Sequence, residues 1–190
     1  MIESLDVDHL IVVEPHADDA FLSMGQHIEE RTKANKLTTI LTIFSGTRKR
    51  ARDAEDYAKA VGAIWLGTGL VEAQPLDEDR VMAQVTPLAL DEGSLFVVPL
   101  GLTHPEHIAV RDMFLRKTTN CCAFYLDQPY AITQKNGALT TELMKGKRVL
   151  SYRHPGVRKY RHIPLFKDQA KFYHYNPAAK LVQTSELIVA

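Results

Sequence analysis

The sequence predicts an α/β fold, with a mostly parallel sheet and helices on both of its faces. Short apolar runs at residues 10–13 and 95–98 are typical of strands buried on both sides, and amphipathic helical segments lie between such runs. Histidine and carboxylate side chains follow each of these two runs. In open α/β sheets ligands bind at the carboxyl ends of the strands, so the same pattern predicts a site at that edge.

The expected elements alternate regularly in the first half of the chain. Residues 9–13 are expected to form a strand, and residues 19–35 a helix with one apolar face. The Thr- and Ile-rich residues 37–44 favour a second strand. Residues 50–61 favour a helix that ends at Gly62, because glycine commonly terminates helices.

The second half continues this alternation. Residues 76–90 favour a helix, although Pro87 is expected to break or bend it. The other expected elements are a helix at 106–117 and strands at 63–66, 95–99, 121–126, 149–152 and 186–189. This strand–helix order predicts parallel strands with helices on both sides of the sheet. Since no repeat, linker or low-complexity tract interrupts the chain, residues 1–190 are expected to form a single domain.

Composition narrows the function classes. The 190 residues carry a formal net charge of zero, which argues against a general nucleic-acid binder because such proteins have a basic excess. The adjacent Cys121 and Cys122 suit buried thiols in a reducing compartment. The acidic N-terminus does not resemble a signal peptide, and no apolar run approaches the ~18 residues of a membrane span. We therefore expect a cytoplasmic protein.

The segment Pro-His-Ala-Asp-Asp at residues 15–19 carries side chains that suit a catalytic metal site. His16 offers an imidazole nitrogen, and one turn of a starting helix brings Asp19 to the same side. Asp18 points elsewhere, so it can miss the metal and still reach a metal-activated water as a general base. A metal site with an open position for water is therefore one interpretation of this segment.

The segment His-Pro-Glu-His at residues 104–107 complements the first one. His107 supplies a third ligand, and His104, one turn earlier, could stabilise an oxyanion or protonate a leaving amine. The spacing alone leaves a second interpretation open, in which the histidines are ordinary loop residues. An Asp pair is also a common helix start, since aspartate accepts hydrogen bonds from the first N–H groups of a helix.

Together, the two segments resemble the signature of the LmbE-like, or PIG-L, superfamily of zinc-dependent N-deacetylases. The first motif of that family runs His-Pro-Asp-Asp-Glu or Pro-His-x-Asp-Asp, and the second runs His-Pro-Asp-His. Further similar segments follow in family order: Ser-Gly-Thr at 45–47, Arg-Asp-Ala-Glu at 52–55 and Tyr-Leu-Asp-Gln-Pro-Tyr at 125–130. The resemblance covers roughly the first 130 residues and implies a Rossmann-like fold.

The resemblance implies a role for each matched residue. It implies that the zinc ligands are His16, Asp19 and His107, that Asp18 is the general base and that His104 stabilises the oxyanion or donates a proton. Among the matched residues, those expected to bind substrate are Arg52, Asp127 and Tyr130.

The implied activity is removal of acetyl from an N-acetylated sugar by metal-dependent amide hydrolysis. The implied substrate is a small molecule, an N-acetylglucosamine-type glycoside, lipid or nucleotide conjugate. Zn²⁺ is the expected cofactor, and two histidines with one aspartate also suit Fe²⁺. Related enzymes are often oligomers, so a homo-oligomer is compatible with the resemblance.

Two departures from the family pattern keep other functions open. Ala20 stands where many members have Glu, and Glu106 replaces Asp. With the short chain, these departures leave open a non-catalytic carbohydrate-binding protein, or a hydrolase of a different amide or ester. A nucleotide-binding enzyme is disfavoured, because no Gly-x-Gly-x-x-Gly follows the first strand.

Overall fold

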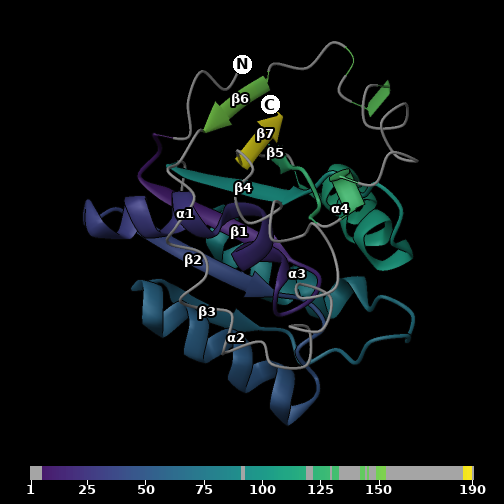
Figure 1. Ribbon diagram of the computed structural model, residues 1–190. Coiled ribbons are helices and arrows are strands. Elements are labelled where there is room, and N and C mark those ends of the chain that lie inside the picture. The colour runs from purple at the N-terminus through teal and green to yellow at the C-terminus, as the bar shows by residue number, and fades with distance from the viewer. Residues whose placement is uncertain are drawn as a thin grey trace.

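The protein is built around one seven-stranded sheet (Figure 1). The structure, a computed structural model, describes residues 6–90, 93–118, 122–128, 130–132, 142–143, 145, 149–152 and 186–189. The strands lie side by side in the order β3-β2-β1-β4-β5-β7-β6. Their bounds are β1 His9–Glu14, β2 Leu37–Thr42, β3 Ile64–Gly67, β4 Ser94–Pro99, β5 Cys122–Tyr125, β6 Val149–Tyr152 and β7 Glu186–Val189.

The mostly parallel sheet expected from the sequence is confirmed. β1 pairs in parallel with β2 on one side and β4 on the other, and β3 and β5 extend this parallel part at its two ends. β7 runs antiparallel to both β5 and β6. The two strands expected near the end of the chain therefore extend the sheet as an antiparallel pair.

Helices cover both faces of the sheet, also as expected. α1 and α2 pack on the face to which Leu10 and Val12 point, and α3 and α4 on the face to which Ile11 and Val13 point. β1 is consequently buried along its whole length, as a strand of a two-sided parallel sheet should be. The helix bounds are α1 Asp19–Lys33, α2 Arg48–Val61, α3 Glu78–Ala89, α4 Pro105–Lys117 and the 3₁₀ helix η1 Tyr130–Ile132. None of the helices in the described ranges has the length and apolar character needed to cross a bilayer.

Several helix boundaries differ by one or two residues from those expected. α2 begins earlier, at Arg48, because the Thr47 hydroxyl accepts a hydrogen bond of 3.2 Å from the Arg50 N–H and caps the first turn. It ends as expected at Gly62, whose φ of 77° favours glycine. Pro87 does not end α3, because it lies in the last turn and disturbs only the final backbone hydrogen bonds. The first residue of the expected strand 121–126 lies outside the described residues.

The strand order brings two distant segments together. After β1 the chain extends the sheet on one side through β2 and β3, and it then returns to add β4 on the other side of β1. The segments that follow β1 and β4 therefore leave the same edge of the sheet next to each other, which is where α/β proteins bind ligands. Gly101 turns the chain after β4 with a φ of 72°, and a Cβ there would lie 3.1 Å from the Cα of Ile108. α1 and α4 start at this edge and carry the residues of the candidate site (Figure 1).

Candidate metal and catalytic site

Three side-chain atoms converge where β1 and β4 end. His16 follows β1, Asp19 opens α1, and His107 lies in the first turn of α4. The distance from His16 Nδ1 to His107 Nε2 is 3.2 Å, and Asp19 Oδ2 lies 3.4 Å from the first nitrogen and 3.2 Å from the second. The fold therefore brings together three residues that stand up to ninety-one positions apart.

This triangle fits a divalent metal ion. Ligand atoms at about 2.0–2.2 Å from a tetrahedral metal lie roughly 3.3–3.6 Å from one another. His104 offers an alternative third donor, since its ring also comes within 4.8 Å of the nitrogens of His16 and His107. The set with Asp19 has edges of 3.2–3.4 Å, which match the spacing of ligands around such a metal, and Asp19 is 4% exposed and His107 wholly buried. The donor set with Asp19 therefore fits better.

Without a metal, the triangle is held by protons and charge. Burial alone would lower the pKa of His16, but hydrogen bonding and charge from Asp19 raise it to about 9. His107 behaves in the same way, and Asp19 with the buried Asp127 raises its pKa to about 10. The two imidazoles in turn hold the pKa of Asp19 well below its usual range, against the effect of burial. A buried anion facing two cations is the environment that a divalent cation can replace.

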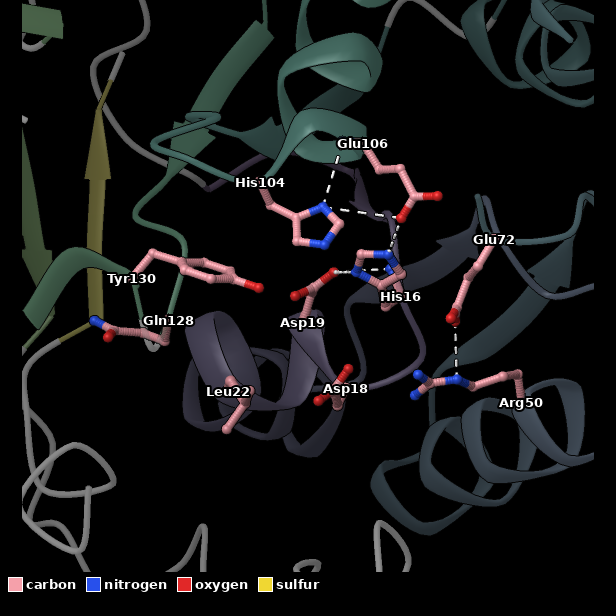
Figure 2. A pocket seen from close by; sticks show the side chains of 10 residues that line it. All are labelled: His16, Asp18, Asp19, Leu22, Arg50, Glu72, His104, Glu106, Gln128 and Tyr130. Atoms are coloured by element: carbon pink, nitrogen blue, oxygen red, sulfur yellow. Dashed lines mark hydrogen bonds and ion pairs between the residues drawn. The ribbon is translucent and has the colours of Figure 1, made fainter. Parts of the chain in front are cut away.

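A carboxylate lies behind each imidazole. Glu106 Oε2 is 2.6 Å from His16 Nε2, and its other oxygen accepts a hydrogen bond of 2.7 Å from the Ala73 N–H. A carboxylate at this place fixes the proton on Nε2, so that Nδ1 presents its lone pair to a metal. The replacement of the family's Asp by Glu106 therefore retains a carboxylate within reach of His16 (Figure 2).

Asp127 lies behind His107 in a similar place, at a longer distance. Its Oδ2 lies 3.3 Å from His107 Nδ1 and accepts a hydrogen bond of 2.9 Å from the Leu102 N–H. Asp127 was expected to contact substrate, but it is fully buried and does not line the pocket. Its geometry is that of a residue that orients His107 from behind.

Asp18 lines the pocket beside the triangle (Figure 2). Burial and the adjacent Asp19 carboxylate together raise the pKa of this carboxyl to about 6, against the opposing charge of Arg50. A carboxylate with a pKa near neutrality is well suited to accept a proton from water.

His104 caps α4 and keeps one ring nitrogen for the pocket. Its Nδ1 accepts a hydrogen bond of 3.3 Å from the Glu106 N–H, so a neutral ring carries its proton on Nε2. Burial, together with the positive charges of His16 and His107, lowers the pKa of His104. In Figure 2 the second nitrogen points toward Asp19, so a neutral His104 has an N–H donor beside the triangle.

The pocket in front of the triangle has a volume of about 190 Å³. Arg50 and Glu72 line one side of it, with Arg50 Nε 2.9 Å from Glu72 Oε1, and Tyr130 lines another. Arg50 Nη1 is buried and has no hydrogen-bond partner within the described part of the chain. Arg52, expected to bind substrate, is exposed on α2 and does not line the pocket. The full lining is His16, Asp18, Asp19, Leu22, Arg50, Glu72, His104, Glu106, Gln128 and Tyr130.

Four of the residues that complete the site were not expected there from the sequence. Arg50 belongs to the basic run at 48–52, which lies at the start of α2. The sequence alone does not show which arginine of this run faces the pocket. Glu72 has no motif around it, and Gln128 lies inside the segment at 125–130, in which only Asp127 and Tyr130 were expected to bind substrate. Glu14 could have been noticed in the sequence, because a carboxylate at the end of an apolar strand is unusual. In the structure it is fully buried, and burial raises its pKa to about 8.

Solved structures of deacetylases have the same fold. A deacetylase of the teicoplanin biosynthesis pathway matches with a TM-score of 0.75 and 15% identity over 95% of this chain and 96% of its own. The N,N′-diacetylchitobiose deacetylase of Pyrococcus horikoshii matches with a TM-score of 0.56 and 13% identity over 97% of this chain and 84% of its own. The chain therefore shares its fold with these deacetylase structures.

This shared fold does not by itself decide the reaction. GalB, a 4-carboxy-2-hydroxymuconate hydratase of Pseudomonas putida KT2440, matches with a TM-score of 0.57 and 10% identity over 96% of both chains. A teicoplanin deacetylase, Orf2, has been solved in a zinc-inhibited form, and it matches with a TM-score of 0.72 and 15% identity over 95% of this chain and 97% of its own. No protein-family model and no curated protein matches this chain. The function has to be argued from the side chains of the site.

Proposed function

We propose that this protein is a metal-dependent deacetylase that releases acetate from an N-acetylated sugar. The observation that carries the proposal is the triangle of His16 Nδ1, Asp19 Oδ2 and His107 Nε2, with edges of 3.2–3.4 Å and with Asp18 beside it. Three protein ligands leave a coordination position open, which is the arrangement of hydrolytic metal sites. The deacetylase structures that share the fold support the same reaction class.

The metal ligands and the base have separate roles in this proposal. His16, Asp19 and His107 hold the ion, and Glu106 and Asp127 fix the tautomers of the two imidazoles. When bound, a divalent metal supplies Lewis-acid chemistry, which polarises an acyl carbonyl and lowers the pKa of water. Asp18 accepts the proton of the attacking water, for which its pKa of about 6 is suitable.

In this proposal His104 donates a hydrogen bond to the reacting carbonyl, while Asp18 acts on the attacking water. Its neutral form carries hydrogen on Nε2, and this N–H can bond to the oxygen that becomes negative in the transition state. The amine that leaves must also receive a proton, which Asp18 or His104, both in the pocket beside the triangle, can provide. Tyr130 lines the same side of the pocket, its ring centre 6.0 Å from that of His104, which supports a contact with substrate.

Arg50 and Glu72 suit the hydroxyl groups of a sugar. The pair offers donors and an acceptor held 2.9 Å apart, and Arg50 Nη1 is a buried donor to which no described residue hydrogen-bonds. Neighbouring hydroxyls of a pyranose each donate and accept, so they match a fixed donor–acceptor pair. Arg50, rather than Arg52, is the arginine that we propose for substrate binding.

The test is metal-dependent release of a primary amine. Purified protein is stripped with a chelator, reloaded with Zn²⁺, Fe²⁺ or Co²⁺, and incubated with N-acetylglucosamine, its aryl glycoside, N,N′-diacetylchitobiose and a nucleotide-linked N-acetylglucosamine. We expect amine release that chelator abolishes and metal restores. Because a zinc-inhibited form of a teicoplanin deacetylase is known, zinc is tested over a range of concentrations, from below one equivalent to excess.

The matched control is Asp18→Asn, which removes the base and leaves the three ligands. We expect this variant to bind metal as the unchanged protein does and to lose about 10²- to 10⁴-fold in kcat. A protein that binds metal and N-acetyl sugars but releases no amine from any of them would be a carbohydrate-binding protein. Amine release that is insensitive to chelator would contradict the proposed mechanism.

A further inference from the structure

The start of α1 is capped in an unusual way. Asp18 is the N-cap residue of this helix, yet its side chain makes no capping hydrogen bond. An N-cap aspartate ordinarily accepts a hydrogen bond from the second or third N–H of its helix, and the second belongs to Ala20. Asp18 instead lines the pocket. Some other group must therefore satisfy the Ala20 N–H, which is buried.

Glu14 is that group. Its Oε2 accepts a hydrogen bond of 3.0 Å from the Ala20 N–H, so the last residue of β1 caps a helix that begins five residues later. Its other oxygen accepts a hydrogen bond of 2.6 Å from the Thr42 hydroxyl, which itself accepts one of 2.9 Å from Trp65 Nε1. The Glu14 side chain is fully buried and anchored from β2 and β3, so the cap is held firmly.

We propose that Glu14 is a positioning residue, and that it keeps Asp18 in the pocket by occupying the Ala20 N–H to which Asp18 would otherwise bond. This inference rests on the proposed deacetylase function, since it assigns to Glu14 the task of supporting the base. The Asp19 carboxylate does not cap the Ala20 N–H either, because it accepts a hydrogen bond of 2.8 Å from the His16 N–H. Glu14 thus provides the cap that an aspartate at a helix start usually provides, and the Asp18 carboxylate stays in the pocket for the reaction.

The test compares two substitutions of nearly equal volume. Glu14→Gln keeps an oxygen acceptor for the Ala20 N–H, and Glu14→Met fills the same space without one. We expect Glu14→Gln to retain kcat within about threefold, and Glu14→Met to lose roughly tenfold or more in kcat with KM and bound metal unchanged. If Glu14→Met fails to fold, Glu14→Ala is the second variant, and thermal unfolding of every variant verifies the folded state.

A crystal structure of Glu14→Met gives a readout that does not depend on activity. We expect an Asp18 carboxylate oxygen within hydrogen-bond distance of the Ala20 nitrogen, turned away from the pocket. If no variant and not even the unchanged protein releases amine, the proposed function fails, while this structural result still decides the role of Glu14. Full kcat in Glu14→Met, equal loss in both variants, loss of metal or an unmoved Asp18 would each overturn the inference.

Discussion

At the scale of single residues, Arg50 and Arg52 make a matched pair. Both lie on α2, but Arg50 lines the pocket and pairs with Glu72, while Arg52 is exposed. We expect Arg50→Gln to raise KM for N-acetyl sugars about 10- to 100-fold, because a charge-assisted hydrogen bond to a hydroxyl is worth roughly 1.5–3 kcal/mol. Arg52→Gln should leave both KM and kcat unchanged. Steady-state kinetics decides the matter, and an effect at Arg52 alone would reverse the assignment.

Asp127 was expected to contact substrate, but in the structure it is buried behind His107. The same Asp127 oxygen, Oδ2, contacts both the Leu102 N–H and His107 Nδ1, so in Asp127→Asn an amide oxygen can keep both contacts while the negative charge is lost. Without that charge the proton on His107 Nδ1 is held less firmly, and Nε2, the atom that points at Asp19, becomes a weaker donor to a metal. We expect metal affinity to fall about 10- to 100-fold, as measured by competition with a chromophoric chelator.

The control for this prediction is Asp112→Asn, the same change at a partly exposed aspartate of α4 that pairs with Arg111. It should leave metal affinity unchanged. Undiminished affinity in Asp127→Asn would show that Asp127 does not orient His107, and a substrate contact would again be the better interpretation of this residue.

The residue types of the site could be read from the sequence, but not all of their roles. The two motifs identified His16, Asp18, Asp19, His104 and His107, which do converge. Asp127 was expected to contact substrate, and its burial away from the pocket could not be foreseen, because a motif does not show whether a carboxylate faces the pocket or the back of a metal ligand. Arg52 was expected to bind substrate because it opens the Arg-Asp-Ala-Glu segment that resembles the family, and the sequence does not show which arginine of the basic run at 48–52 faces the pocket.

At the scale of elements, the end of α2 offers a test that is independent of the site. Gly62 has a φ of 77°, and a Cβ there would meet Thr32 Cβ only at an ordinary contact distance of 3.6 Å. Gly62→Ala should therefore lower the free energy of unfolding by about 1–2 kcal/mol through backbone strain alone. Gly62→Asn should cost less, because asparagine tolerates this conformation. Denaturant unfolding measures both, and an unchanged stability in Gly62→Ala would contradict the strain argument.

Most elements followed from local sequence. Buried parallel strands are continuous apolar runs, so β1 and β4 were evident, and β6 and β7 were located with the bounds that the structure has. Pro87 was expected to break or bend its helix, but α3 continues through it to Ala89. A proline this close to the end of a helix has less than one turn after it to displace. The antiparallel direction of β7 relative to β5 and β6 is set by pairing across more than thirty residues, which no local pattern reports.

At the scale of the whole molecule, charge links metal binding to pH. In the metal-free protein the pKa values of His16 and His107 are raised to about 9 and about 10, so both rings hold a second proton at pH 7. A metal can take their lone pairs only if protons leave, so metal affinity should rise as pH increases from 7 to 9. Calorimetric titration at pH 7 in buffers of different ionisation enthalpy should detect at least one proton released for each metal bound. Binding without proton release would contradict the doubly protonated state of the two imidazoles.

The strand order is what makes the site, because it joins the segments after β1 and β4 at one edge of the sheet. The central claim is that a single ion lies between His16 Nδ1, Asp19 Oδ2 and His107 Nε2. X-ray diffraction from crystals loaded with one equivalent of metal, recorded on both sides of the absorption edge of that metal, tests this most directly. The account predicts one strong anomalous peak at about 2.0–2.2 Å from all three atoms. A peak elsewhere, or none at full metal loading, would contradict it.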